Sequence, residues 1–381
     1  LSVFLSVCVS VCLSVCLSVC LSVCLSVSVG RSVSLSICLS VCGSVGLSLC
    51  PSVHPSVRPS VCLYLYELIA FNCRYGHYAP YLDRMMKGET NILTKDQPVI
   101  FAVTSGTSGK SAIIPMLKKQ QGTFFTQGIS IVYDSMHSAF PKFGSSQKDM
   151  KFFYTPRLRA SECGIPVGPN SSSPANSKRI LSMYSTPKAG FEVLTEPEAM
   201  YVHLLFGLKD RNLGLIEANF ASLIYSAFRN LDENWDTLVN DIEKGSVSEN
   251  LKIDESVRKE LNQLMSPDPK RANELKDARN QGTIGLVKRI WPYINFVMTA
   301  DSGTFELYGE RLRELHCKDV PIYSPLYAAS EGLLGINIWP TERPSRYLLA
   351  LKSMFFEFIP VDKCEEENPE TLFIDQVINI T

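Results

Sequence analysis

From residue 98 onward, short runs of apolar residues alternate with longer stretches in which apolar residues recur at helical spacing. Runs rich in β-branched and aromatic residues predict strands. These runs are PVIFAV (98–103), KFFY (151–154), INFVMT (294–299), VPIY (320–323), LLGINIW (333–339) and MFFEFIPV (354–361). Strand groups that flank a long helical stretch predict an α/β protein in which helices pack against mixed sheets.

The helical pattern is strongest between residues 197 and 292, which we expect to be mostly helix. In EANFASLIYSAFR, which we interpret as core, apolar residues three and four positions apart are Phe220, Leu223, Ile224, Ala227 and Phe228. NWDTLVNDIEKG repeats this spacing and ends in Lys244 and Gly245, which predict a helix C-terminus. The Pro-, Gly-, Ser- and Asn-rich segment 164–177 predicts a loop, either on the surface or beside the site.

The first 66 residues follow a different pattern, in which Leu, Ser, Val and Cys recur with a four-residue period. No common repeat fold has a unit of this length. A tetranucleotide repeat, TCTG, encodes Ser-Val-Cys-Leu and returns to the same frame, so we favour a translated repeat from a gene model, disordered if made. The uncharged residues 1–30 are also long enough to cross a bilayer of about 30 Å, which keeps a membrane segment as an alternative. We therefore divide the chain into this segment, 1–66, and a folded part, 67–381.

Composition narrows the class of protein. The formal net charge is −1 at pH 7, so no basic field favours a nucleic-acid partner. Most of the 13 cysteines lie in the repeat, and the others are Cys73, Cys163, Cys317 and Cys364. Isolated cysteines without C-x-x-C spacing indicate a reducing compartment, no metal site, and a role as small buried residues.

The stretch TSGTSGKS, directly after PVIFAV, has the composition of a phosphate-binding loop. Its GKS ending matches a Walker A loop, but the first glycine of that motif would be residue 104, which is Thr, and we therefore disfavour a P-loop nucleotidase. In the other interpretation the whole stretch binds phosphate through hydroxyl donors, flexible glycines and one lysine. The predicted residues are Thr104, Ser105, Gly106, Thr107, Ser108, Gly109, Lys110 and Ser111.

A second candidate segment, PLYAASEGLLGINIW, lies in a tight connection between two predicted strands. Tyr327 is placed to cover a flat base, and Ala328 and Ala329 leave room for it. After Ser330, Glu331 offers a carboxylate to Mg²⁺, an ion that takes few protein carboxylates and keeps water and phosphate oxygens as its other ligands. The structural alternative puts Tyr327 in the core and makes Glu331 one of many surface acids.

The two segments, in this order, resemble the motifs of the Gretchen Hagen family of acyl-acid amido synthetases, relatives of the firefly-luciferase-like adenylate-forming enzymes. TSGTSGKS is similar to the family's Ser/Thr-Ser-Gly-Thr-Ser/Thr-x-Gly motif, and Tyr327, Ser330 and Glu331 match Tyr-x-x-Ser-Glu. PYLDRMMKGETNILT, FASLIYSAFRNLDENWDTLVNDIEKG and FFEFIPVD extend the resemblance over about residues 75–378, closest to the animal branch. A third motif, Tyr-Arg-x-Gly-Asp, is absent, so we expect a large N-terminal domain without its small C-terminal lid or its first helices.

The resemblance implies that ATP and a small carboxylic acid form an acyl-adenylate with loss of pyrophosphate, and that an amino acid then displaces AMP. It implies ATP and Mg²⁺ as cofactors. By this resemblance, Thr104 to Ser111 would bind the phosphates, and Tyr327 to Ser330 would face the adenine. Glu331 would bind Mg²⁺. Lys110 and Glu331 would be the catalytic residues. VMTADSGTFELY (297–308) lies where the family has a substrate-side loop, but its added Asp301 departs from the plant pattern.

We keep two alternatives to an enzyme: a non-catalytic nucleotide-binding or scaffold member of the family, and a membrane protein anchored by residues 1–30. We expect a cytoplasmic protein with no nucleic-acid partner and no stable membrane insertion. Association with a membrane or the endoplasmic reticulum is expected only if the apolar N-terminus is present in the mature protein.

Overall fold

Two sheets organise the computed structural model, which describes residues 4–6, 75–104, 111–143, 146–154, 158–170, 181–366 and 369–378. The first has four strands in the order β3-β2-β6-β5, and the second has four parallel strands in the order β4-β7-β8-β9. Their bounds are β2 (Ile100–Val103), β3 (Ile113–Met116), β4 (Lys148–Lys151), β5 (Arg159–Ala160), β6 (Pro166–Gly168), β7 (Leu213–Phe220), β8 (Phe296–Ala300) and β9 (Ile322–Tyr323). This arrangement confirms the predicted α/β class.

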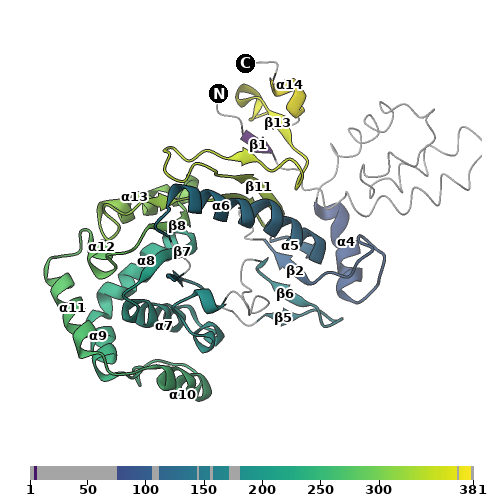
Figure 1. The fold of residues 1–381 in the computed structure, drawn as a ribbon. Coiled ribbons are helices and arrows are strands. Elements are labelled where there is room, and N and C mark those ends of the chain that lie inside the picture. Colours follow the sequence, from purple (N-terminus) through teal and green to yellow (C-terminus); the bar gives the residue numbers. More distant parts are fainter. Residues whose placement is uncertain are drawn as a thin grey trace, which may run out of the picture.

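Helices cover both faces of the parallel sheet (Figure 1). Because side chains alternate along a strand, Ile216 and Val297 point into the large core formed with the helices after β6, whereas Leu215 and Phe296 point into a second core formed with α6. The helices are α4 (Tyr75–Met86), α5 (Lys118–Phe124), the π-helix η3 (Phe125–Ile129), α6 (Ser130–Ala139), α7 (Glu196–Lys209), α8 (Ala221–Glu233), α9 (Trp235–Lys244), α10 (Glu255–Leu264), α11 (Pro269–Asn280), α12 (Leu286–Ile290), α13 (Glu306–Glu314) and α14 (Ile374–Ile378). Short 3-10 turns are η5 (Leu181–Met183), η6 (Lys188–Glu192), η7 (Gly303–Phe305) and η8 (Val361–Lys363).

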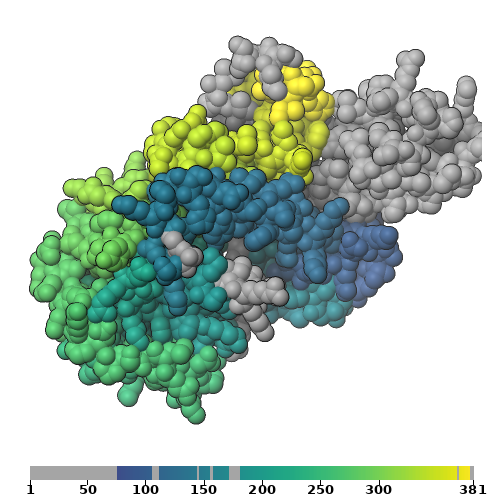
Figure 2. All heavy atoms as spheres, in the orientation of Figure 1, coloured from purple at the N-terminus to yellow at the C-terminus, as the bar shows by residue number. Residues whose placement is uncertain are grey.

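A smaller antiparallel unit lies beyond α6. It contains β10 (Leu326–Ala329), β11 (Gly332–Ile336) and β12 (Leu348–Leu349). Next to it, β13 (Glu357–Ile359) pairs with β1 (Phe4–Ser6). Figure 2 shows the segment around α5 and α6 as a blue band between this yellow unit and the green helical block. The other residues of the repeat segment, 1–66, lie outside the described part, so the prediction made for them stays a prediction.

Several predicted boundaries are wrong. The first four residues of EANFASLIYSAFR belong to strand β7, which interrupts the helical region, and Phe220 is 44% exposed rather than core. The helical spacing misled because β7 runs directly into α8, with Phe220 as the N-cap. The strand expected at 151–154 is β4, which ends at Lys151, and β6 lies inside the predicted loop 164–177.

The C-terminus of α9 confirms the predicted helix end at Gly245, which has φ +71°. Gly245→Ala is expected to lower the free energy of unfolding by about 2–3 kcal/mol, because left-handed backbone is strained for alanine and the new methyl group collides with its neighbours. A Cβ at this position would lie 2.2 Å from the Pro267 nitrogen. Urea-induced unfolding measures the change.

The control for this substitution is Gly122→Ala. Gly122 lies in α5, and a Cβ there would meet no atom within 4 Å. Alanine is expected to stabilise this helix by up to about 1 kcal/mol. Equal effects of the two substitutions would contradict the assigned role of Gly245.

Within the described ranges, no helix is long and apolar enough to cross a membrane. The membrane alternative rests on residues 1–30, which fall outside those ranges apart from Phe4–Ser6.

Candidate functional site

The predicted phosphate loop connects the two strands of an antiparallel hairpin, β2 and β3. At its base the Thr104 N–H donates to the Ala112 carbonyl at 2.9 Å, and the Ala112 N–H donates to Thr104 Oγ1 at 2.9 Å. Thr104 therefore closes the loop, and its hydroxyl keeps one proton to donate. The predictions for Ser105, Gly106, Thr107, Ser108, Gly109 and Lys110 lie outside the described residues.

This setting excludes a Walker A loop. In a P-loop protein the glycine-rich loop runs from a strand into a helix, whose N-terminus faces the phosphates. Here Ser111 and Ala112 lead straight into β3, which pairs back onto β2 over Ile100–Val103. The rejection made from the missing glycine is confirmed.

The second candidate segment is a β-hairpin rather than a single tight connection between the predicted strands. Leu326–Ala329 form β10, which pairs antiparallel with β11 and has an irregularity between Tyr327 and Ala328. Ser330 and Glu331 form the turn. Tyr327 is 45% exposed, which excludes the core alternative, and its ring lies 5.7 Å from that of Tyr347. Glu331 is half-buried.

Two features connect this hairpin with the rest of the site. First, it follows β9 and so begins at the carboxyl end of a parallel sheet, the edge where open α/β sheets bind ligands. Second, β3 continues through α5 into η3, where Gly128 lies against the hairpin. A Cβ on Gly128 would meet Leu333 at 3.1 Å and Leu326 at 3.7 Å. The segment that follows the phosphate loop therefore packs directly on the strands that carry Tyr327 and Glu331.

A polar cluster that the sequence did not predict lies near the same edge. Lys151 Nζ is 2.9 Å from Glu217 Oε1, and these side chains are 24% and 10% exposed. Asp149 lies two residues before Lys151 and is 2% exposed. Lys151 also lies over the ring of Tyr184, 5.6 Å from its centroid. A single carboxylate within an otherwise apolar run, LGLIEA, is the signal that could have indicated Glu217, because such groups are rarely buried without a partner.

Burial is the main cause that raises the pKa of the Asp149 carboxyl, to about 8. The negative charge of Glu217 also raises this pKa, and the positive charge of Lys151 partly offsets both effects. Burial likewise raises the pKa of the Tyr133 and Tyr184 hydroxyls above their ordinary range. Asp149 is therefore mostly protonated at neutral pH and can donate a hydrogen bond.

Because the pKa of Asp149 is raised on folding, its contribution to stability is full at acidic pH and is lost as pH rises towards 8. Asp149→Asn is expected to remove this loss, so the free energy of unfolding should fall less between pH 5 and pH 8 in the variant than in the wild type. Urea unfolding at both pH values measures the difference. Burial lowers the pKa of His203 to about 4, so His203 makes the free energy of unfolding rise with pH. This contribution is the same in the wild type and the variant, and it cancels in their difference. Parallel pH curves would contradict this assignment of Asp149.

Mg²⁺ has one candidate ligand in this part of the site. Among the described residues, no group of three or more His, Cys, Asp or Glu is arranged to hold a metal ion. A site for Mg²⁺ with ATP does not need such a group, because one or two carboxylates suffice beside phosphate oxygens and water. Glu331, half-buried in the turn between β10 and β11, offers one such carboxylate.

Three of the four cysteines outside the repeat lie in the described part of the chain. Cys163, Cys317 and Cys364 are free. Cys317 is 1% exposed, as predicted for a small core residue, whereas the other two are half-buried.

Parallel and antiparallel sheets with packed helices form a mixed α/β domain, in which one hairpin carries the TSGTSGKS segment and another carries Tyr-x-x-Ser-Glu. Residues 73–322 match the GH3 family N-terminal domain. The chain belongs to the GH3 family, which confirms the resemblance found in its motifs.

Curated relatives carry ligase and synthetase names. The 4-substituted benzoates-glutamate ligase GH3.12 of Arabidopsis thaliana is 29% identical over 305 residues, 76% of this chain and 52% of the relative. The jasmonoyl--L-amino acid synthetase JAR4 of Nicotiana attenuata is 28% identical over 297 residues, 74% of this chain and 50% of the relative. The chain thus spans about half the length of these relatives.

A solved structure with a similar fold is the AtGH3.15 acyl acid amido synthetase in complex with 2,4-DB. Its TM-score is 0.69 at 22% identity, and the match covers 79% of this chain and 53% of that chain. At this identity the likeness supports the mixed α/β fold alone.

Proposed function

We propose that this chain supplies the ATP-binding domain of an acid–amino acid ligase, which activates a small carboxylic acid as its acyl-adenylate and conjugates it to an amino acid. The observation that carries the proposal is the GH3 family match over residues 73–322, combined with the two hairpins that hold TSGTSGKS and Tyr-x-x-Ser-Glu. Relatives named as amino acid ligases support the reaction class. We place residues 67–381 in this domain and the protein in the cytoplasm.

Each hairpin has a distinct part in the proposed mechanism. The loop Thr104–Ser111 would hold the β- and γ-phosphates through hydroxyl and backbone donors, with the charge of Lys110 stabilising the leaving pyrophosphate. Tyr327, Ala328, Ala329 and Ser330 would face the adenine side. Glu331 would hold Mg²⁺, which when bound neutralises phosphate charge.

The reaction asks little acid–base chemistry of the protein. A substrate carboxylate is already ionised at neutral pH and attacks the α-phosphorus directly, with pyrophosphate as the leaving group. The amine of the amino acid, after losing a proton to solvent, then attacks the acyl carbon; AMP leaves and a second proton is released as the amide forms. The domain has chiefly to align carboxylate and phosphate and to stabilise the charge that develops, which fits a site built from hydroxyl, amide and lysine donors.

A pyrophosphate exchange assay tests the proposal. The chain is incubated with ATP, Mg²⁺, labelled pyrophosphate and a panel of aromatic, aliphatic and indole carboxylic acids, and acid-dependent formation of labelled ATP is expected. Equilibrium dialysis measures ATP binding in parallel. Binding of ATP without exchange for any acid would favour the alternative, a non-catalytic nucleotide-binding or scaffold member of the family. Absence of ATP binding would reject both the enzyme and a nucleotide-binding member, and would leave a scaffold protein.

A further inference from the structure

The loop after β8 is fixed by one buried carboxylate. Asp301 is 4% exposed, and its Oδ2 accepts hydrogen bonds from Arg313 on α13 and, at 2.8 Å, from Arg343. Arg343 also donates to the Ile322 carbonyl on β9. Three separate segments, the end of β8, the helix α13 and the segment after β11, therefore meet at Asp301.

Gly309 makes this approach of α13 possible. A Cβ on Gly309 would lie 2.8 Å from the Cβ of Asp301 and 3.2 Å from Nη1 of Arg313, so only glycine leaves room for the carboxylate. The chain accepts a glycine inside a helix here, although glycine costs about 0.5–1 kcal/mol relative to alanine. The packing is thus arranged around the Asp301 side chain.

The segment anchored by Arg343 reaches the second candidate motif within a few residues. The Tyr347 hydroxyl lies 2.7 Å from Ser324 Oγ, and the Tyr347 ring lies 5.7 Å from the ring of Tyr327. Tyr347 also packs on the strand opposite Tyr327: its Cβ would be 2.9 Å from a Cβ built on Gly335, the cross-strand partner of Tyr327. Arg343, bonded to Asp301, and Tyr347, which lies against Tyr327, are therefore four residues apart on one segment that connects the cluster with the hairpin.

The cluster is not the arrangement expected from stability alone. Two guanidinium groups share one carboxylate oxygen, while Asp301 Oδ1 and the neighbouring Thr299 Oγ1 are buried with no hydrogen-bond partner among the described residues. Burial and the charge of Arg343 lower the pKa of Arg313 to about 10. A buried polar atom without a partner destabilises the fold, so these three segments come together at a cost in stability.

We propose that Asp301, Arg313 and Arg343 form a positioning cluster, which holds the β10–β11 hairpin and Tyr327 in the geometry that receives the nucleotide. The expected effect of the cluster on ATP binding rests on the proposed function. The expected effect of the cluster on the position of the hairpin does not. Asp301, Arg313 and Arg343 act through Tyr347 and are not themselves in contact with the nucleotide.

The first measurement is amide hydrogen exchange of the free protein. Asp301→Asn keeps the shape of the side chain but removes the charge that holds both arginines. Exchange of the amides in 324–336 is expected to accelerate at least about tenfold, because the hairpin then opens locally more often. Arg343→Gln, at a side chain that is 41% exposed and whose loss the fold should tolerate, is expected to give the same local change.

The matched control is Arg311→Gln. Arg311 lies on the same helix as Arg313, but it pairs at 3.0 Å with the exposed Glu314 and has no contact with Asp301 in the described part of the chain. It is expected to leave exchange at 324–336 unchanged. If hydrogen exchange at 324–336 is as slow in Asp301→Asn and Arg343→Gln as in Arg311→Gln, the proposal of a positioning cluster is overturned.

The second measurement is the dissociation constant of ATP, determined by calorimetric titration. Asp301→Asn and Arg343→Gln are expected to weaken ATP binding at least about fivefold, the lower range of coupling between two sites, whereas Arg311→Gln should bind as the wild type. Faster exchange with unchanged ATP affinity would overturn the proposal and leave the cluster a purely structural one. If the wild type fails to bind ATP, the proposed function fails, while hydrogen exchange still decides whether the cluster holds the hairpin.

Discussion

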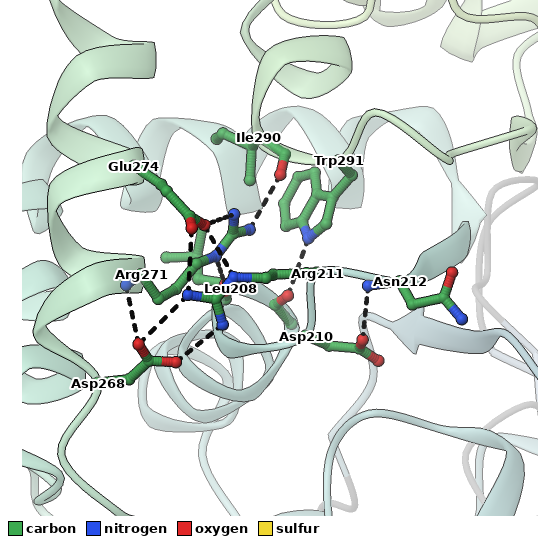
Figure 3. A network of polar contacts seen from close by, with 10 residues as sticks. Leu208, Asp210, Arg211, Asn212, Asp268, Arg271, Glu274, Ile290 and Trp291 are labelled. Atoms are coloured by element: carbon green, nitrogen blue, oxygen red, sulfur yellow. Dashed lines mark hydrogen bonds and ion pairs between the residues drawn. The ribbon is translucent and has the colours of Figure 1, made fainter.

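Arg271→Met is expected to lower the free energy of unfolding by about 3–5 kcal/mol, the range typical of losing one partner of a buried ionic network. Arg271 is 4% exposed and lies where α7, α11 and α12 meet (Figure 3). It donates to the Leu208 carbonyl at 2.7 Å, to the Ile290 carbonyl at 2.9 Å and to Glu274 at 3.2 Å. Methionine fills a similar volume but leaves two buried carbonyl groups without donors. Chemical unfolding monitored by circular dichroism measures the loss.

The control for this substitution is Lys276→Met on the same helix. Lys276 Nζ lies 2.8 Å from Glu243, but both side chains are exposed, at 47% and 42%. Exposed ion pairs contribute about 0–1 kcal/mol, so this variant is expected to unfold almost as the wild type does. A similar loss in both variants would show that charge on α11, and not the buried donors of Arg271, determines the effect.

Features that depend on one continuous stretch of residues could be predicted from the sequence. PVIFAV is apolar and β-branched, so strand β2 follows from local chemistry, whereas phosphate binding by the stretch after it stays a prediction. The end of α9 at Gly245 follows in the same way, because glycine adopts the left-handed conformation without strain. The family resemblance rests on contiguous stretches of this kind.

Features that join distant residues could not be predicted. Lys151 and Glu217 are 66 positions apart, and Asp301 and Arg343 are 42 positions apart. Their pairing depends on strand order and register, which place β7 next to β4 and the segment after β11 next to β8. Strand β7 itself was missed because it is central and covered on both faces, so its residues lack the alternation of a half-exposed strand.

Glu331→Gln is expected to lower the rate of acid-dependent pyrophosphate exchange by about 10²-fold, a magnitude typical of removing one electrostatic contact to a developing charge. Glutamine keeps the size and hydrogen-bonding capacity of the side chain and removes only its charge. Glu331 lies in the turn between β10 and β11, where the backbone pairing of Ala329 with Gly332 does not involve its side chain. The fold is therefore expected to be retained, as the melting temperature will show.

The requirement for Mg²⁺ separates a metal ligand from a residue that merely shapes the turn. In Glu331→Gln the concentration of Mg²⁺ at half-maximal exchange is expected to rise at least about tenfold, because a carboxylate ligand is lost from an ion that prefers charged oxygen. The control is Glu314→Gln, an exposed carboxylate on α13 paired with Arg311, which should change neither the rate nor the Mg²⁺ dependence. Binding of Mn²⁺ with ATP, followed by electron paramagnetic resonance, gives a readout independent of turnover. A slower Glu331→Gln variant with unaltered metal dependence and unaltered Mn²⁺ binding would reject Glu331 as the ligand, since a charge that does not bind the metal would leave both quantities unchanged.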